Sequence, residues 1–192
     1  MAVTGSNPVL YAIVCGAGPA PDVGRLVGNA QARGWDTHLI ATPAALGFID
    51  VAALEPQTGH PIRSHYRTTN TQRERALPHA DAIIVAPATY NTINKWAHGT
   101  SDTYALGILA ETTGLGIPTV VLPFVNTALA ANPAFTRSVG YLRDAGVHLL
   151  LGPDYWEPHP PGTGNAHIPG YPWHQTLDIA ERVTHANRSP QQ

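Results

Sequence analysis

The sequence predicts a three-layer α/β fold, in which a doubly wound parallel sheet is covered by helices on both faces. Short apolar runs of the length of buried strands alternate with helix-like segments along most of the chain. The chain has 192 residues with a hydrophobic content of 43%, which is enough for about one domain with a substantial core. We therefore expect a Rossmann-like, flavodoxin-like architecture.

The first half of the chain predicts two strands, two helices and a loop. Gly34 follows a helix-like segment and supplies a helix stop. Gly59 and Pro61 lie in a polar stretch with few apolar residues, which indicates irregular structure. We expect strands over residues 9–15 and 36–41, helices over residues 22–33 and 43–54, and a loop over residues 55–71.

The second half continues the alternation around a central apolar run. We expect strands over residues 82–86, 119–122 and 147–151, and helices over residues 91–97, 101–113, 132–145 and 174–184. Residues 152–173 are rich in proline and glycine and predict an extended segment. The prediction is thus a single domain over residues 1–187, followed by a disordered tail over residues 188–192.

Composition excludes several classes of protein. The net charge is -2 and Lys95 is the single lysine, so no basic surface of the kind that neutralises a nucleic-acid backbone is expected. The apolar run at residues 9–14 is too short for a membrane span and reads as a core strand. Cys15, the one cysteine, cannot form an internal disulfide. We expect a cytoplasmic protein that binds neither nucleic acid nor membranes.

Two glycines after the first strand point to a phosphate-binding turn. Gly16 and Gly18 stand between a strand and a helix, where backbone amides can face a phosphate. The dinucleotide fingerprint requires a third glycine where the chain has Pro21, and an acidic residue after the second strand where it has Thr42. A mononucleotide is therefore favoured over NAD, although the glycines could also serve only a tight turn.

The segment after the central strand carries a family resemblance. Residues 87–92 read Pro-Ala-Thr-Tyr-Asn-Thr, with Ile93, Asn94 and Lys95 following in order. This stretch resembles the FMN-binding flavoproteins that include phosphopantothenoylcysteine decarboxylases and epidermin-type peptidyl-cysteine decarboxylases. The resemblance implies FMN as cofactor. It also implies contacts to FMN from Gly16, Ala17, Gly18, Thr42, Ala44, Phe48, Pro87, Ala88, Thr89, Asn91, Thr92 and Asp102.

A second resemblance lies in residues 123–133, which are similar to the substrate-recognition segment of the same family. The resemblance implies that Asn126 binds a substrate carboxylate, so the substrate would be a small molecule or a peptide terminus. Val125 and Ala130 replace larger residues of the family pattern. The pocket wall is therefore expected to be smaller and the substrate to differ.

The chain departs from the family at two functional positions. The catalytic histidine of the family falls on Arg73, whose guanidinium stays charged and cannot act as a base near neutral pH. His65 is one candidate for a displaced base. The flap cysteine of phosphopantothenoylcysteine decarboxylases is also missing, because no cysteine follows Cys15. Three C-terminal histidines, His159, His167 and His174, are irregularly spaced, so no metal site is predicted.

Two functions remain open at this stage. The chain is either an oxidative cysteine decarboxylase with an altered active site, or an FMN-binding redox or carrier subunit without that activity. Flavin prenylation is disfavoured, because Asn91-Thr92 stands where that family has Lys-Thr. The resemblance further implies a homotrimer or a multiple of trimers, and the charged content of only 12% leaves surface available for burial between subunits.

Overall fold

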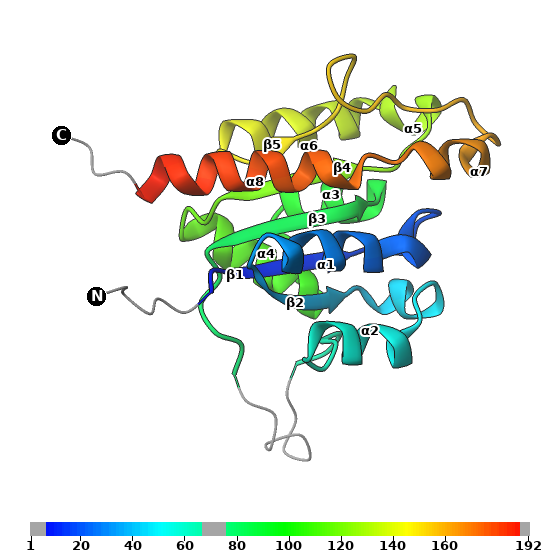
Figure 1. Cartoon of the computed structure of the whole chain (residues 1–192). Coiled ribbons are helices and arrows are strands. Elements are labelled where there is room, and N and C mark those ends of the chain that lie inside the picture. The colour runs from blue at the N-terminus through cyan, green and yellow to red at the C-terminus, as the bar shows by residue number, and fades with distance from the viewer. Residues whose placement is uncertain (1–6, 67–75, 189–192) are drawn as a thin grey trace, which may run out of the picture.

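The computed structural model describes residues 7–66 and 76–188, which contain a five-stranded parallel sheet. The strand order is β2-β1-β3-β4-β5, so the chain reverses direction across the sheet after β2, as in a doubly wound fold. The predicted fold class is confirmed (Figure 1). The strands are β1 (Val9–Val14), β2 (Asp36–Ala41), β3 (Ala82–Ala88), β4 (Thr119–Pro123) and β5 (His148–Leu149).

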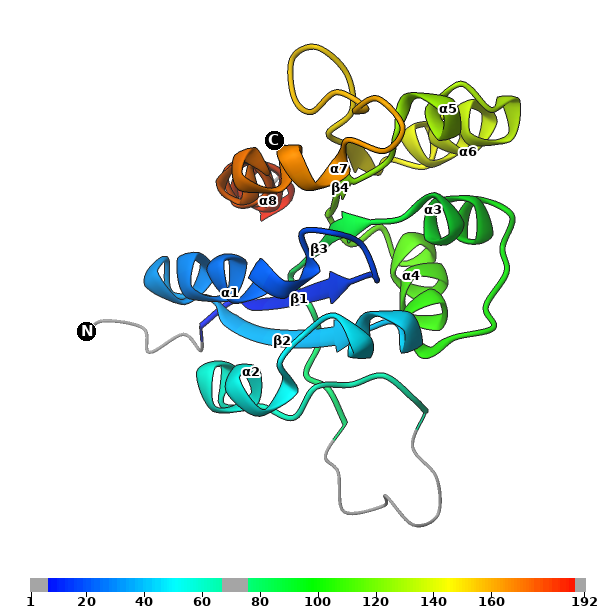
Figure 2. The ribbon, with the colours of Figure 1, turned by 90° about the vertical axis from the view of Figure 1, so that its right-hand side faces the viewer.

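Helices cover both faces of the sheet (Figure 2). One face carries α1 (Val23–Ala32) and α8 (Trp173–Arg188), and α2 (Val51–Thr58) packs beside α1 and β2. The other face carries α3 (Tyr90–Ala97), α4 (Tyr104–Gly114) and α6 (Pro133–Asp144). The short helices are η1 (Ala20–Asp22), η2 (Pro43–Gly47), α5 (Thr127–Ala130), α7 (Gly164–His167) and η4 (Ile168–Gly170).

The two faces follow from the alternation of side chains along each strand. In β1, Leu10 and Ala12 join the core on the α1 and α8 face, whereas Tyr11 and Ile13 join the core on the α3 and α4 face. All seven residues of β3, the central strand, are buried. A continuous apolar run is typical of a parallel strand covered on both sides, which is the pattern that the sequence shows.

The predicted helix over residues 43–54 is wrong in its extent. The chain forms η2, breaks, and starts α2 at Val51, so residues 55–58 are helical rather than loop. The break is stabilised by Asp50, whose side chain accepts a hydrogen bond from the backbone N–H of Ala53 and caps the new helix. Gly59, with a φ of 74°, ends the helix in a left-handed conformation.

Other boundaries also differ from the prediction. The central strand does not end at Ala86 but continues through Pro87 to Ala88, with a register shift against β4. The last helix runs from Trp173 to Arg188, so Arg188 is helical and not part of a tail, and the rest of the predicted tail, residues 189–192, lies outside the described part of the chain. The segment predicted to be extended contains α7 and η4. Within the described residues, no helix is both long and apolar enough to cross a membrane.

Candidate functional site

A cavity of about 330 Å³ opens where β1, β2 and β3 end, beside the start of α4. The carboxyl edge of a parallel sheet is the usual place for a ligand in this architecture. The lining surface is mostly apolar, and its polar groups are four threonine hydroxyls, the Asn91 carboxamide and the Lys95 ammonium group. The lining residues are Gly16, Thr42, Pro43, Ala44, Thr89, Asn91, Thr92, Lys95, Thr103 and Leu106.

One wall of this cavity is made by a close approach of two backbone turns. A Cβ atom placed on Gly16 would lie 3.1 Å from both the carbonyl carbon and the carbonyl oxygen of Ala44. Backbone atoms cannot yield as a flexible side chain can, so this position requires glycine. The second turn is held by Thr42, whose N–H donates to Val14 O at 3.0 Å and whose hydroxyl accepts from Ala45 N at 3.3 Å.

The opposite wall is the first turn of α3. The hydroxyls of Thr89 and Thr92 lie 3.0 Å apart, and Thr89 also accepts a hydrogen bond from the backbone N–H of Thr92. The Cys15 thiol donates to the Thr92 hydroxyl at 3.3 Å. Burial raises the pKa of Cys15, so the thiol stays protonated and supports the wall instead of acting as a nucleophile.

A single cation borders the cavity among its lining residues. Lys95 forms an ion pair with Asp102, which does not itself line the cavity. The Asp102 carboxylate therefore affects the cavity only by neutralising part of the lysine charge. The cavity as a whole presents hydroxyls, one carboxamide and this partly neutralised charge. The polar groups of this lining can pair with hydroxyl and oxo groups of a ligand, and the apolar remainder can contact a flat ring.

Six of the twelve predicted cofactor residues line the cavity: Gly16, Thr42, Ala44, Thr89, Asn91 and Thr92. The other six predicted residues lie outside the lining: Ala17, Gly18, Phe48, Pro87, Ala88 and Asp102. Pro87 and Ala88 are buried within β3, where their carbonyls accept hydrogen bonds from Cys15 N and Phe124 N. Phe48 is 45% exposed and does not pack on the start of a helix.

Gly18 is used for packing against the C-terminal segment. A Cβ atom there would lie 3.0 Å from the Ile168 side chain and 3.2 Å from the Phe124 ring. Three lining residues were missed by sequence reasoning, Lys95, Thr103 and Leu106, whereas Pro43 lies in the turn between the predicted residues Thr42 and Ala44. Of these, Thr103 could have been found from the sequence, because it follows a glycine-containing turn and stands at the N-cap position of α4, close to the start of the helix predicted over residues 101–113.

Asn126 lies at the same edge of the sheet, one strand further along. Its side-chain oxygen caps α5 by accepting a hydrogen bond from Leu129 N at 2.9 Å, so the amide Nδ2 is the group that could donate to a ligand. The C-terminal segment reaches this point, because Thr127 N donates to His159 O at 2.8 Å. The His159 ring lies against the Phe124 ring at an interplanar angle of 35°, with centroids 4.7 Å apart.

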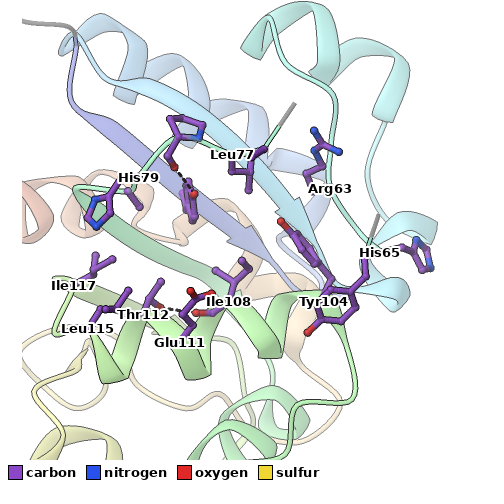
Figure 3. Close-up of a pocket in the computed structure, with 15 residues that line it drawn as sticks. Arg63, His65, Leu77, His79, Tyr104, Ile108, Glu111, Thr112, Leu115 and Ile117 are labelled. Carbon is purple, nitrogen blue, oxygen red and sulfur yellow. Dashed lines mark hydrogen bonds between the residues drawn. The ribbon is translucent and has the colours of Figure 1, made fainter. Parts of the chain in front are cut away.

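A larger cavity, of about 550 Å³, lies on the other side of α4 (Figure 3). It is lined by residues of β1, α4 and the segments 63–66 and 76–80, and it contains the predicted candidate base His65. Burial, followed by repulsion from Tyr104 and Glu111, raises the pKa of Tyr11 in this cavity to about 12. His65 is exposed, and its Nδ1 lies 2.7 Å from the Ser64 hydroxyl. Arg73 lies outside the described residues.

Curated proteins with similar sequences include enzymes of coenzyme A biosynthesis. The chain is 27% identical over 121 residues to the bifunctional protein CoaBC of Thermococcus kodakarensis, covering 62% of this chain and 30% of that protein. It is 26% identical over 117 residues to a probable phosphopantothenoylcysteine decarboxylase of Streptococcus mutans, covering 59% of this chain and 65% of that protein. The chain thus spans less than a third of the length of CoaBC.

Solved structures with the same fold include two decarboxylases. The FMN-dependent cysteine decarboxylase TvaF from thioviridamide biosynthesis superposes with a TM-score of 0.71 at 20% identity, covering 93% of this chain and 98% of TvaF. The cypemycin decarboxylase CypD superposes with a TM-score of 0.70 at 22% identity, covering 97% of each chain. At these identities the two structures establish the fold.

Family membership rests on the sequence as a whole. A model of the Flavoprotein family matches residues 4–175, which include all five strands and the entire small cavity. The resemblance predicted from the Pro87 segment is confirmed by this match. The chain therefore belongs to the Flavoprotein family.

Proposed function

We propose that the protein binds FMN in the 330 Å³ cavity and catalyses a flavin-dependent, decarboxylase-like reaction. The observation that carries the proposal is the contact of the Gly16 and Ala44 turns opposite the Thr89 and Thr92 hydroxyls, in a chain of the Flavoprotein family. Three hydroxyls and the Asn91 carboxamide would hold the polar atoms of FMN. Lys95 would supply positive charge beside its phosphate or ring oxygens.

The substrate we propose is a small molecule or a peptide that ends in a cysteine carboxylate. When bound, FMN supplies a two-electron acceptor for oxidation of the cysteine side chain, and loss of carbon dioxide follows. Asn126 is the residue that we assign to the carboxylate, because its oxygen is already used by the cap of α5 and its Nδ2 is a donor. The TvaF and CypD structures support this choice of substrate class by analogy of fold.

The active site that we propose is altered where the family has its histidine. Arg73 would bind a carboxylate or phosphate of the substrate and would not accept a proton. His65, the candidate for a displaced base, lines the 550 Å³ cavity and not the 330 Å³ cavity, so we do not assign the base to it. A second function, an FMN-binding redox or carrier subunit, is favoured by the same substitution, because a chain without a base at this position can retain FMN and lose the reaction.

One experiment separates the two functions. Purified protein is incubated without oxygen with cysteine-ended peptides and, separately, with phosphopantothenoylcysteine, while flavin absorbance and released carbon dioxide are followed. Bleaching of the flavin together with carbon dioxide supports the decarboxylase. Stable yellow protein with no carbon dioxide supports the carrier, and protein whose extracted cofactor is NAD or FAD, or that holds none, contradicts both.

We also propose that the protein is a homotrimer or a multiple of trimers, with FMN held where subunits meet. Exposed Phe48 and Tyr141 add apolar surface that an interface could bury. Light scattering of the yellow protein tests this proposal. A monomer of 20.4 kDa that retains FMN would contradict it.

A further inference from the structure

Three ionisable side chains from two segments meet at the amino half of β2. Asp36 and His38 are two residues apart in the strand and therefore point to the same face. His60 follows Gly59, the residue that ends α2. Its Nε2 lies 2.6 Å from one carboxylate oxygen of Asp36, and Nε2 of His38 lies 3.4 Å from the other. The two imidazole rings are stacked, with centroids 3.9 Å apart and an interplanar angle of 18°.

We propose that Asp36, His38 and His60 bind a divalent transition-metal ion, with Zn²⁺ as the best fit. Their ligand atoms all lie within 4.8 Å of one another. Tetrahedral Zn²⁺, with ligands at about 2.0–2.1 Å, needs separations of about 3.3 Å between ligand atoms. In the stacked arrangement the two imidazoles cannot both direct a lone pair at one ion, so binding requires His60 to turn out of its stack on His38. The side chains of Asp36 and His60 are 38% and 31% exposed, which leaves room for this rotation, and solvent can supply the fourth ligand.

The donor set favours a metal over a purely hydrogen-bonded cluster. His38 is only 7% exposed, and its Nε2 has a long 3.4 Å contact with Asp36. Burial disfavours a charged imidazole, so the ring can offer a lone pair. Two imidazole nitrogens and one carboxylate are a common zinc ligand set. Arg63 contributes positive charge near His38 and opposes a cation, so we expect micromolar rather than nanomolar affinity.

The backbone fixes His60 beside the strand. Arg63 N donates to Leu39 O at 3.1 Å, and Ala41 N donates to Arg63 O at 2.8 Å, which places the segment 60–63 along β2. Metal binding would therefore join this segment to the strand. The site lies at the opposite end of β2 from Thr42, so it is separate from the 330 Å³ cavity and does not depend on the proposed function.

The test measures binding of Zn²⁺ alone to tag-free protein that has been dialysed against a chelator. Isothermal titration at neutral pH is expected to give one ion per chain. Co²⁺ in place of Zn²⁺ is expected to give the intense visible bands of a four-coordinate site. Asp36→Asn and His60→Gln are each expected to weaken Zn²⁺ binding by about tenfold or more. The matched control is His148→Gln, an exposed histidine on β5 at the other edge of the sheet, which should bind as the unsubstituted protein does.

Two results would overturn the proposal. One is the absence of stoichiometric Zn²⁺ binding, and the other is equal affinity in the unsubstituted protein, Asp36→Asn and His60→Gln. Circular dichroism establishes that each variant is folded, and the two partly exposed positions are chosen because replacement of the buried His38 could disturb the core. Flavin content serves as a second control and should be the same in all variants.

Discussion

The two cavities on either side of α4 are built in different ways. The 330 Å³ cavity is made of turns that directly follow β1, β2 and β3, together with the start of α4, and most of its lining residues are threonine, glycine or alanine. The 550 Å³ cavity is assembled from separate segments and collects titratable groups such as Tyr11, His79 and Glu111. Only the smaller one is described by short motifs in the sequence. The comparison teaches that the cavity we propose for FMN is distinguished by the close approach of two backbone turns and not by its size.

The largest effect is expected at the backbone contact. Gly16→Val would place a Cβ atom 3.1 Å from the Ala44 carbonyl group, so we expect loss of bound flavin and a free energy of unfolding lower by about 1–3 kcal/mol. Flavin absorbance per chain and urea unfolding measure the two effects. Gly47→Ala is the matched control, because a Cβ atom there meets nothing within 4 Å and the residue has no left-handed φ. Retention of flavin by Gly16→Val would show that the close contact between the Gly16 and Ala44 turns is not needed for flavin binding.

A nearly equal loss of flavin is expected for Asn91→Trp. Asn91 is an exposed residue in the first turn of α3 that lines the small cavity, so the indole would fill the cavity without disturbing the core. The protein should be colourless, with an unchanged unfolding midpoint. If the yellow colour persists, the flavin ring lies elsewhere.

A smaller effect is expected for Arg73, which the sequence places at the position of the family histidine. Arg73→Ala should weaken binding of a substrate carboxylate or phosphate by about 1.5–3 kcal/mol, the scale of a charge-assisted hydrogen bond. Titration with a cysteine-ended peptide measures this change. Arg73→His should create or increase carbon dioxide release. If both variants behave as the unsubstituted protein does, the position has no role at the site.

A modest dependence of stability on pH is expected from His159. Burial, and then repulsion from His167, lower the pKa of His159 below its ordinary value of 6.5. The folded state therefore favours the neutral ring, and its contribution to stability is complete above about pH 6.5 and is lost as the pH falls through the lower folded value. Urea midpoints measured from about pH 7 to about pH 5 should fall less steeply in His159→Gln than in the exposed control His98→Gln. Equal slopes of the urea midpoint against pH in the two variants would contradict the assignment of this pH dependence to His159.

The smallest effect is expected in the larger cavity. Ile108→Trp adds bulk on the side of α4 that faces away from the flavin cavity. Flavin content and flavin affinity should be unchanged. A colourless Ile108→Trp variant would mean that both cavities belong to one site, and the distinction between them would be lost.

Local features of the sequence predicted most of the fold and about half of the small cavity. The strands were found because both faces of a parallel sheet are apolar, and Gly16, Thr42 and Thr89 were found because they directly follow strands. The last turn of α2 was missed because Pro56 and Gly59 are typical of loops. The break before α2 was missed because the cap at Asp50 was not considered.

Contacts between distant segments could not be predicted in the same way. The cluster of Asp36, His38 and His60 joins positions 22 to 24 residues apart, and it depends on how the chain after α2 returns along β2. Sequence spacing had directed attention to His159 and His167, which stack against each other beside Phe124. No local pattern distinguishes these two arrangements, because packing decides which histidines meet.

The short pairing of Arg63 with Ile40 has a consequence for how this protein associates. β2 is the outermost strand on its side of the sheet, and an uncovered outer strand offers its N–H and C=O groups to any other strand. Here Leu39 O and Ala41 N are already bonded to Arg63. The pairing therefore leaves these two backbone groups unavailable to a strand of another molecule, so this part of β2 is protected against extension of the sheet at its edge.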